Sequence, residues 1–262
     1  MQVNKVFACL IFIVFSLFSF HSKADDTKRE FYQLTVFHFI NTQQEQIIDQ
    51  YLEKAYLPAL HKRGIKLVGV FKPIVNDTAI DKIIYILIPL SKLEQVKDLS
   101  VQVMNDKVYL VAGKEYLEAS AKNPPYQRME NILLQAFALA PVMQLPKLTG
   151  TKNERIYELR SYESATEKLY RNKVQMFNEG GEIALFKRLE FNAVFYAEVI
   201  AGHHMPNLMY MTSFENKAER DIHWKKFGED PEWKRLSSLP QYQNNVSKAD
   251  IILMNTAPYS DY

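Results

Sequence analysis

The chain has 262 residues, of which 47% are hydrophobic, 13% aromatic and 24% charged, and its formal net charge is +2. This composition excludes an intrinsically disordered chain, a collagen-like repeat and a polytopic membrane protein, and the length allows one or two domains that need no disulfide or metal for stability. A charge this close to zero excludes a long-range field that would gather nucleic acid or anionic membrane.

The first 24 residues are predicted to be a secretory signal peptide. Lys5 supplies a positive start, and Val6–Phe20 is an apolar run of 15 residues. A membrane-spanning helix needs about 20 such residues, so the run fits a signal peptide better. Small residues at the cleavage positions predict a cut after Ala24, which would give an exported chain, periplasmic or secreted, that begins at Asp25. An uncleaved anchor is the alternative.

The segment after residue 24 reads as two divergent copies of one domain, 125 residues apart. Ten identities occur at this offset between Tyr32 and Glu94, and most of the matched positions agree in hydrophobic pattern. A fixed period of this kind is the signature of a repeated structural unit. Pro and Gly punctuate a polar stretch at residues 145–151. We therefore expect an N-terminal domain at 25–148 and a C-terminal domain at 149–262.

Each half is predicted to follow the order strand, helix, strand, strand, helix, strand. In the first half, the helix after strand Phe31–Phe39 is expected to open with a capping box at Thr42–Glu45. The strands expected after it in the first half are Leu67–Pro73, Ile83–Pro89 and Met129–Phe137. Those of the second half are Arg155–Tyr162, Asn192–Ile200, Leu208–Phe214 and Asp250–Asn255. Second helices are expected from Lys92 and Lys217, with extra helical turns near 108–119 and 231–239.

This order predicts an α+β fold made of two tandem ferredoxin-like βαββαβ domains. The helices of such a domain cover one face of its antiparallel sheet and leave the other face open. Two sheets in one chain can cover each other. We therefore expect the open faces to pack face to face as a pseudo-dimeric α/β barrel, which single-copy relatives of this architecture build from two chains.

Residues 155–255 resemble the NIPSNAP family of the dimeric α/β-barrel superfamily. The resemblance rests on Tyr-Glu-Leu-Arg-x-Tyr at 157–162 and on Arg-x-x-x-Trp-x-x-Phe-x-x-Asp-Pro-x-Trp at 220–233. The first half lacks the Glu-Arg pair and the Asp-Pro-x-Trp, and resembles the family only through the repeat. The resemblance implies a ferredoxin-like barrel but no shared catalytic motif. Relatives in the superfamily include haem-degrading and quinone-forming monooxygenases and small-molecule binders.

Candidate ligand-binding residues lie on the first strand of the second half. Strand alternation puts Glu158, Arg160 and Tyr162 on one face, and we expect this polar face to line the barrel interior. There the Glu and Arg could orient an anionic or carbonyl ligand and move a proton. Tyr196 and Tyr210 are added because their rings can line an apolar cavity. The alternative is an ion pair that only holds the fold together and rings that only pack.

No metal site and no cofactor are expected. The only cysteine, Cys9, would be removed with the signal peptide, which leaves no disulfide, no cysteine nucleophile and no thiolate ligand. The five histidines after residue 24 lack the spacing of a zinc helix, and glycine-rich phosphate-binding signatures are absent from the sequence.

Three functions remain open from the sequence. The first is an exported NIPSNAP-type protein that binds a small, largely apolar ligand in the barrel, with Glu158 and Arg160 at its polar end. The second is a cofactor-free monooxygenase or isomerase that acts on an aromatic or quinone-like compound. The third is a structural or interaction protein whose barrel interior is filled. We expect no nucleic-acid partner and, once the signal peptide is removed, no membrane partner, and a homo-oligomer stays open.

Overall fold

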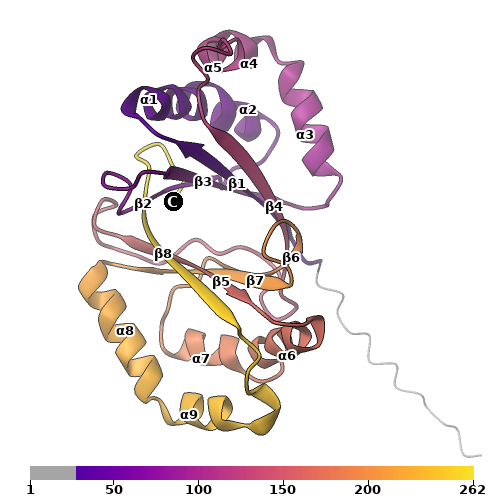
Figure 1. Cartoon of the computed structure of the whole chain (residues 1–262), viewed down its shortest axis with the longest axis vertical. Helices are drawn as coiled ribbons and strands as arrows, with labels where there is room; N and C mark the ends of the chain where they lie inside the picture. Colours follow the sequence, from indigo (N-terminus) through magenta and orange to yellow (C-terminus); the bar gives the residue numbers. More distant parts are fainter. Residues whose placement is uncertain (1–27) are drawn as a thin grey trace, which may run out of the picture.

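The computed structural model describes residues 28–262, so the predicted signal peptide and its cleavage site lie outside the described residues. Among the described residues, no helix is long and apolar enough to cross a membrane. The described residues form two α/β halves. The strands of the two halves face each other, and the helices lie outside them (Figure 1).

The N-terminal half contains four strands and their covering helices. The chain runs through β1 (Phe31–Phe39), α1 (Thr42–Tyr51), the π-helical turn η1 (Leu52–Tyr56), α2 (Leu57–Lys62), β2 (Gly69–Pro73), β3 (Lys82–Leu90), α3 (Gln95–Met104), α4 (Lys107–Ala112), α5 (Lys114–Leu117) and β4 (Arg128–Ala136). The strands pair in the order β4-β1-β3-β2. This is the arrangement of a ferredoxin-like βαββαβ unit.

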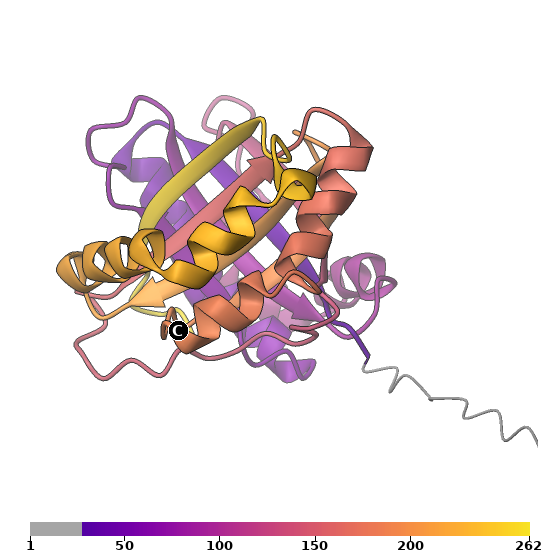
Figure 2. The ribbon, with the colours of Figure 1, turned by 90° about the horizontal axis from the view of Figure 1, so that it is seen from below.

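The C-terminal half repeats the same order of elements. It consists of β5 (Ile156–Glu163), α6 (Glu167–Phe177), α7 (Glu182–Arg188), β6 (Phe195–Ala201), β7 (Asn207–Phe214), α8 (Lys217–Glu229), α9 (Pro231–Ser238), the 3₁₀ turn η2 (Pro240–Tyr242) and β8 (Lys248–Thr256). Its strands pair in the order β8-β5-β7-β6. Figure 2 shows the helices of this half lying across the outer face of the strands.

The two sheets close into one eight-stranded antiparallel barrel. Strand β2 pairs with β8, and β4 pairs with β6, so that each sheet edge is joined to the other half. The helices gather at opposite ends of the molecule, outside the barrel (Figure 1). The predicted fold class, tandem ferredoxin-like units packed face to face, is confirmed.

The barrel interior is filled by side chains from both halves. Its core is apolar and buried, with aromatic rings at the centre: Phe71 packs against Tyr157 at 5.0 Å between ring centroids, and Tyr32 against Phe195 at 5.3 Å. Protein interiors are packed as densely as organic crystals, and rings of this size occupy most of a small barrel. The interior therefore acts as the common core of the two halves.

The pairing register differs by one residue between the halves. Leu34 of β1 lies opposite Leu87 in β3, whereas Leu159, which is 125 residues after Leu34, lies opposite Met211. A shift of one residue turns every side chain of a strand to the other face. Tyr85 consequently lies in the barrel core and Tyr210 under the helices, although the two match at the offset of 125 residues.

The first helix begins one residue earlier than the sequence pattern predicts. The Asn41 side chain accepts a hydrogen bond from the Gln44 backbone N–H at 2.9 Å, and the Gln44 side chain accepts one from the Ile40 backbone N–H at 3.0 Å. Asn is as good an N-cap as Thr, so Asn41 caps the helix in place of Thr42, and Gln44 takes the place of Glu45 as the residue that reaches back, here to Ile40. The predicted box at Thr42–Glu45 was therefore wrong by one position.

The carboxylate of Glu215, directly after β7, holds the segment that connects the two halves. Glu215 accepts hydrogen bonds from the backbone N–H groups of Thr149, at 2.8 Å, and Gly150, at 2.7 Å. These bonds favour the ionised form, so they lower the pKa of Glu215 below its ordinary value.

Acid is therefore expected to release this tie. A carboxyl group whose pKa is lowered in the folded protein stabilises it above the ordinary pKa, and this contribution is lost as the pH falls through the lowered folded value. Hydrogen exchange of the Gly150 amide across the acid range measures the release, with the Leu159 amide of β5 as the control. The Glu215→Gln variant should show little protection of Gly150 at any pH. Constant protection in the unmodified protein would contradict the prediction.

Candidate functional site

The polar face of β5 turns toward the helices and away from the barrel interior. Tyr157 and Leu159, which alternate with the polar residues, belong to the barrel core. Glu158, Arg160 and Tyr162 instead contact α6 and α8. The expectation that these three side chains line the interior was wrong. It assumed an apolar layer beneath the helices, whereas α8 brings charged partners into that layer.

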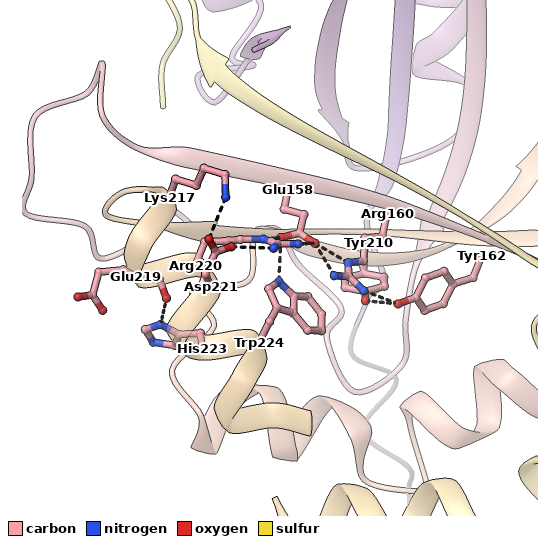
Figure 3. Close-up of polar contacts among 10 residues, drawn as sticks. All are labelled: Glu158, Arg160, Tyr162, Tyr210, Lys217, Glu219, Arg220, Asp221, His223 and Trp224. Atoms are coloured by element: carbon pink, nitrogen blue, oxygen red, sulfur yellow. Dashed lines mark hydrogen bonds and ion pairs between the residues drawn. The ribbon is translucent and has the colours of Figure 1, made fainter. Parts of the chain in front are cut away.

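Glu158 is fully buried and fully paired. Its carboxylate accepts hydrogen bonds from Arg160 Nε at 2.6 Å, from Arg220 Nε at 2.7 Å and from Trp224 Nε1 at 2.8 Å (Figure 3). A buried carboxylate is tolerated when charged donors surround it in this way. Both oxygens of Glu158 are therefore occupied by protein donors.

Helix α8 supplies two of these donors from one face. Arg220 and Trp224 are four residues apart and therefore lie on the same side of the helix. The helix is started by Asn216, whose side chain accepts from the Glu219 backbone N–H at 3.0 Å. The Arg160 guanidinium also lies over the Trp224 ring, 3.5 Å from its centroid, which is a cation–π contact. The pair Arg-x-x-x-Trp was visible in the sequence, but its contact with Glu158 was not.

The tyrosines extend the network as neutral hydroxyls. Arg160 Nη1 donates to the Tyr162 hydroxyl at 3.0 Å, and the hydroxyls of Tyr162 and Tyr210 lie 2.8 Å apart. Tyr196 stacks on Tyr210 with 5.7 Å between ring centroids. Burial raises the pKa of both Tyr196 and Tyr210. The two groups therefore stay protonated near neutral pH and do not act as bases.

A second buried ion pair lies beneath α6 and α7. Lys173 Nζ donates to Glu182 Oε2 at 2.7 Å, and the side chains are only 4% and 2% exposed. Burial raises the pKa of Glu182, and Lys173 opposes that rise. The ammonium group also lies 4.7 Å from the centroid of the Phe177 ring. The sequence analysis missed this pair. The signal available was a lysine on the buried stripe of a helix.

Each buried acid of this layer is paired. Glu158 pairs with Arg160 and Arg220, and Glu182 pairs with Lys173. Arg220 also contacts Asp221, which lies at the exposed side of α8 and pairs with Lys217 as well. Of the predicted site residues, the structure brings Glu158, Arg160, Tyr162 and Tyr210 into one network, which clamps α8 to the sheet. Its contacts favour the alternative in which the ion pair holds the fold together.

A groove of about 770 Å³ lies outside the barrel, on the C-terminal half. One wall is the connecting segment after β4, residues 139–147, which we call the strap. Backbone hydrogen bonds hold the strap near both ends: Phe137 donates to the Tyr196 carbonyl and Gln144 to the Val194 carbonyl, each at 2.9 Å. The opposite wall is α7 with the turn that leads into β6.

The groove is lined by both apolar and polar groups. Buried rings of the C-terminal half line it, namely Phe186, Phe191, Phe195 and Tyr196, and the strap adds exposed Leu139, Val142 and Leu145. Tyr196 is the one predicted candidate on this wall. The remaining members were missed, although apolar residues in a proline-containing linker were a readable signal. Glu190 and Asn192 in the same wall have left-handed backbones, with φ of 58° and 43°, a conformation that concentrates at ligand sites.

Metal ligands do not converge in the part of the chain that the structure describes. Within residues 28–262, no group of three or more His, Cys, Asp or Glu side chains is placed to hold a metal ion.

Comparisons with known proteins find a family similarity in the C-terminal half. Residues 157–261 match the family model described as NIPSNAP. The chain is similar to a solved structure from Lactobacillus acidophilus, provisionally assigned as a monooxygenase, with 10% identity, a TM-score of 0.55, and coverage of 87% of this chain and 94% of that one. A Fusobacterium nucleatum protein with the same provisional assignment gives 8% identity, a TM-score of 0.52, and coverage of 87% and 92%.

A NIPSNAP-like domain protein from Burkholderia xenovorans is 18% identical, with a TM-score of 0.38, over 41% of this chain and 90% of that chain. Curated proteins give no significant match. At these identities, the two structures that cover most of the chain show the shared fold and leave the reaction open.

Proposed function

For this chain, which carries a NIPSNAP domain in residues 157–261, we propose the function of a binding protein for a small, largely apolar ligand. The ligand lies in the groove between the strap and α7. The barrel interior, in contrast, holds the buried apolar core that the two halves share. The proposal keeps the ligand class expected from the sequence and moves the site to the outside of the C-terminal half.

The groove itself is the observation that carries this proposal. Its volume of about 770 Å³ falls in the range of about 300–1,000 Å³ that is typical of small-molecule sites. Buried aromatic rings form its floor and a few polar groups lie at its walls, which is the usual composition of such sites. Backbone hydrogen bonds from Phe137 and Gln144 to Tyr196 and Val194 hold the strap near both of its ends, so the groove exists without a bound ligand.

Binding fits the titratable groups better than acid–base catalysis. A general acid or base needs a group that can exchange a proton with the substrate at working pH. Glu158 is fully paired, and Tyr196 and Tyr210 have raised pKa values.

Export is part of the proposal. It rests on the apolar run Val6–Phe20 and on the small residues before the expected cut after Ala24. An exported binding protein would take up its ligand outside the cytoplasm.

Filling the groove is expected to abolish binding of a neutral apolar dye. The probe is N-phenyl-1-naphthylamine, whose fluorescence rises in an apolar site. Ala193→Trp places an indole in the groove, while Ala184→Trp adds the same group to an exposed position of α7 that does not line the groove. We expect at least a tenfold weaker Kd for Ala193→Trp, about 1.4 kcal/mol, and no change for Ala184→Trp.

Urea unfolding of both variants shows whether each is folded. If Ala193→Trp unfolds, Ala140→Trp fills the same groove from the strap side. Equal dye binding by the folded groove variants and by Ala184→Trp would reject the proposed function, as would the absence of saturable dye binding to the unmodified protein.

A further inference from the structure

We propose that the ligand of the groove is an amphipathic anion, with its carboxylate or similar group held by Lys147 and Lys187 and its apolar body on the aromatic floor. The inference rests on the proposed function and adds the chemical class of the ligand.

Two lysines with no partner stand at the groove. Lys147, at the end of the strap, and Lys187, in the last turn of α7, both line it and are both exposed. Within residues 28–262, neither ammonium group has a carboxylate within 4.0 Å or a hydrogen-bond partner. The next residue along α7, Arg188, shows the contrast, since it pairs with Asp230 at 2.8 Å. Both lysines can therefore receive a ligand charge without breaking an existing pair.

The groove has one acidic side chain against these two bases. Glu190 lines the same wall, and the described lining contains no arginine. The formal charge of the lining is therefore +1. A groove with walls of low dielectric constant focuses such a charge on a bound group. This favours an anion over a neutral or cationic head group.

The apolar part of the ligand is set by the strap. Leu139 and Val142 are exposed at the groove, and Phe186 and Phe191 lie buried beneath it. Such surfaces gain free energy in proportion to the apolar area that they cover. A fully polar anion such as phosphate would leave this area exposed, so the ligand needs an apolar body as well as a charge.

A pair of matched dyes separates the charge from the apolar body. 8-Anilinonaphthalene-1-sulfonate carries a sulfonate on the same phenylnaphthylamine frame as the neutral dye. We expect the unmodified protein to bind the sulfonate dye at least fivefold more tightly than the neutral dye at low salt. This preference should fall as salt is added, because exposed charges are screened.

The double variant Lys147→Gln/Lys187→Gln should lose this preference while its affinity for the neutral dye stays the same. Lys225→Gln/Lys226→Gln makes the same change of net charge on the exposed side of α8 and should keep the preference. Decanoate and decanol, used as competitors, provide the same comparison with an aliphatic body.

The outcomes distinguish the inference from the proposed function. Neutral dye that binds in the groove, without a sulfonate preference or with a preference that the Lys147/Lys187 variant keeps, overturns the anion and leaves the binding function intact. A preference lost equally in the Lys225/Lys226 control also overturns it, because it then reflects net charge alone. Failure of the neutral dye to bind rejects the proposed function itself.

Discussion

Replacing Glu158 by Gln is expected to lower the free energy of unfolding by about 3 kcal/mol or more. The carboxylate is fully buried and holds the guanidinium groups of Arg160 and Arg220, whose side chains are 11% and 19% exposed. A neutral amide leaves Arg160 without a counter-charge and Arg220 with only the exposed Asp221, and breaking a buried pair in this way costs about 3–5 kcal/mol. The loss should be larger than that from any single exposed ion pair of the chain.

Glu163→Gln is the matched control for this measurement. Glu163 lies on the same strand and pairs with Lys248 at 3.1 Å, but its side chain is 20% exposed and that of Lys248 is 52% exposed. Pairs of this kind contribute about 1 kcal/mol or less. Urea unfolding followed by circular dichroism gives both values. Similar losses in the two variants would show that the buried network does not clamp α8 to the sheet.

The fold could be predicted because its signals are local. The strand β1, the helix α1 and the helix α2 recur 125 residues later as β5, α6 and α7, with bounds that agree within a residue or two. Periodicity and turn residues report on short segments, and the order of those segments decided the class. Strand register is a property of two segments at once. The one-residue difference in register, which puts Tyr85 in the barrel core and Tyr210 under the helices, was therefore not predictable from sequence identities at the 125-residue offset.

The residues of the candidate site could be predicted in part, but the side of the sheet on which they lie could not. Alternation correctly grouped Glu158, Arg160 and Tyr162 on one face of β5. Which way that face turns depends on α8, more than 50 residues later, which delivers Arg220 and Trp224 to it. The charge pattern alone suggested that this face lines the barrel interior, because buried charges beneath a helix layer are uncommon.

The groove depends on long-range contacts in the same way. Its two walls come from the strap and from α7, which are about 40 residues apart along the chain. Backbone hydrogen bonds from Phe137 and Gln144 hold the strap against Tyr196 and Val194 at β6, and such bonds cannot be read from side-chain identities in a sequence. Only Tyr196, chosen for its ring, was named in advance.

Lys173→Met is expected to destabilise the protein by about 3–5 kcal/mol at neutral pH, because it leaves Glu182 buried without a partner. The double variant Lys173→Met/Glu182→Met should recover most of this loss, since an apolar pair of similar volume needs no counter-charge. Lys168→Met, at an exposed position of the same helix, serves as the control and should change little.

The single variant should also regain stability in acid. Burial already raises the pKa of Glu182, and removal of Lys173 takes away the main interaction that opposes the rise. Between the ordinary pKa of a glutamate and this raised value, the folded protein holds one more proton than the unfolded chain. Its stability therefore increases as the pH falls through that window. Urea midpoints of Lys173→Met and the double variant, measured from neutral pH down to about pH 4.5, should converge. A gap between them that stays constant over this range would mean that the pKa of Glu182 is not raised in the folded variant, and would contradict the prediction.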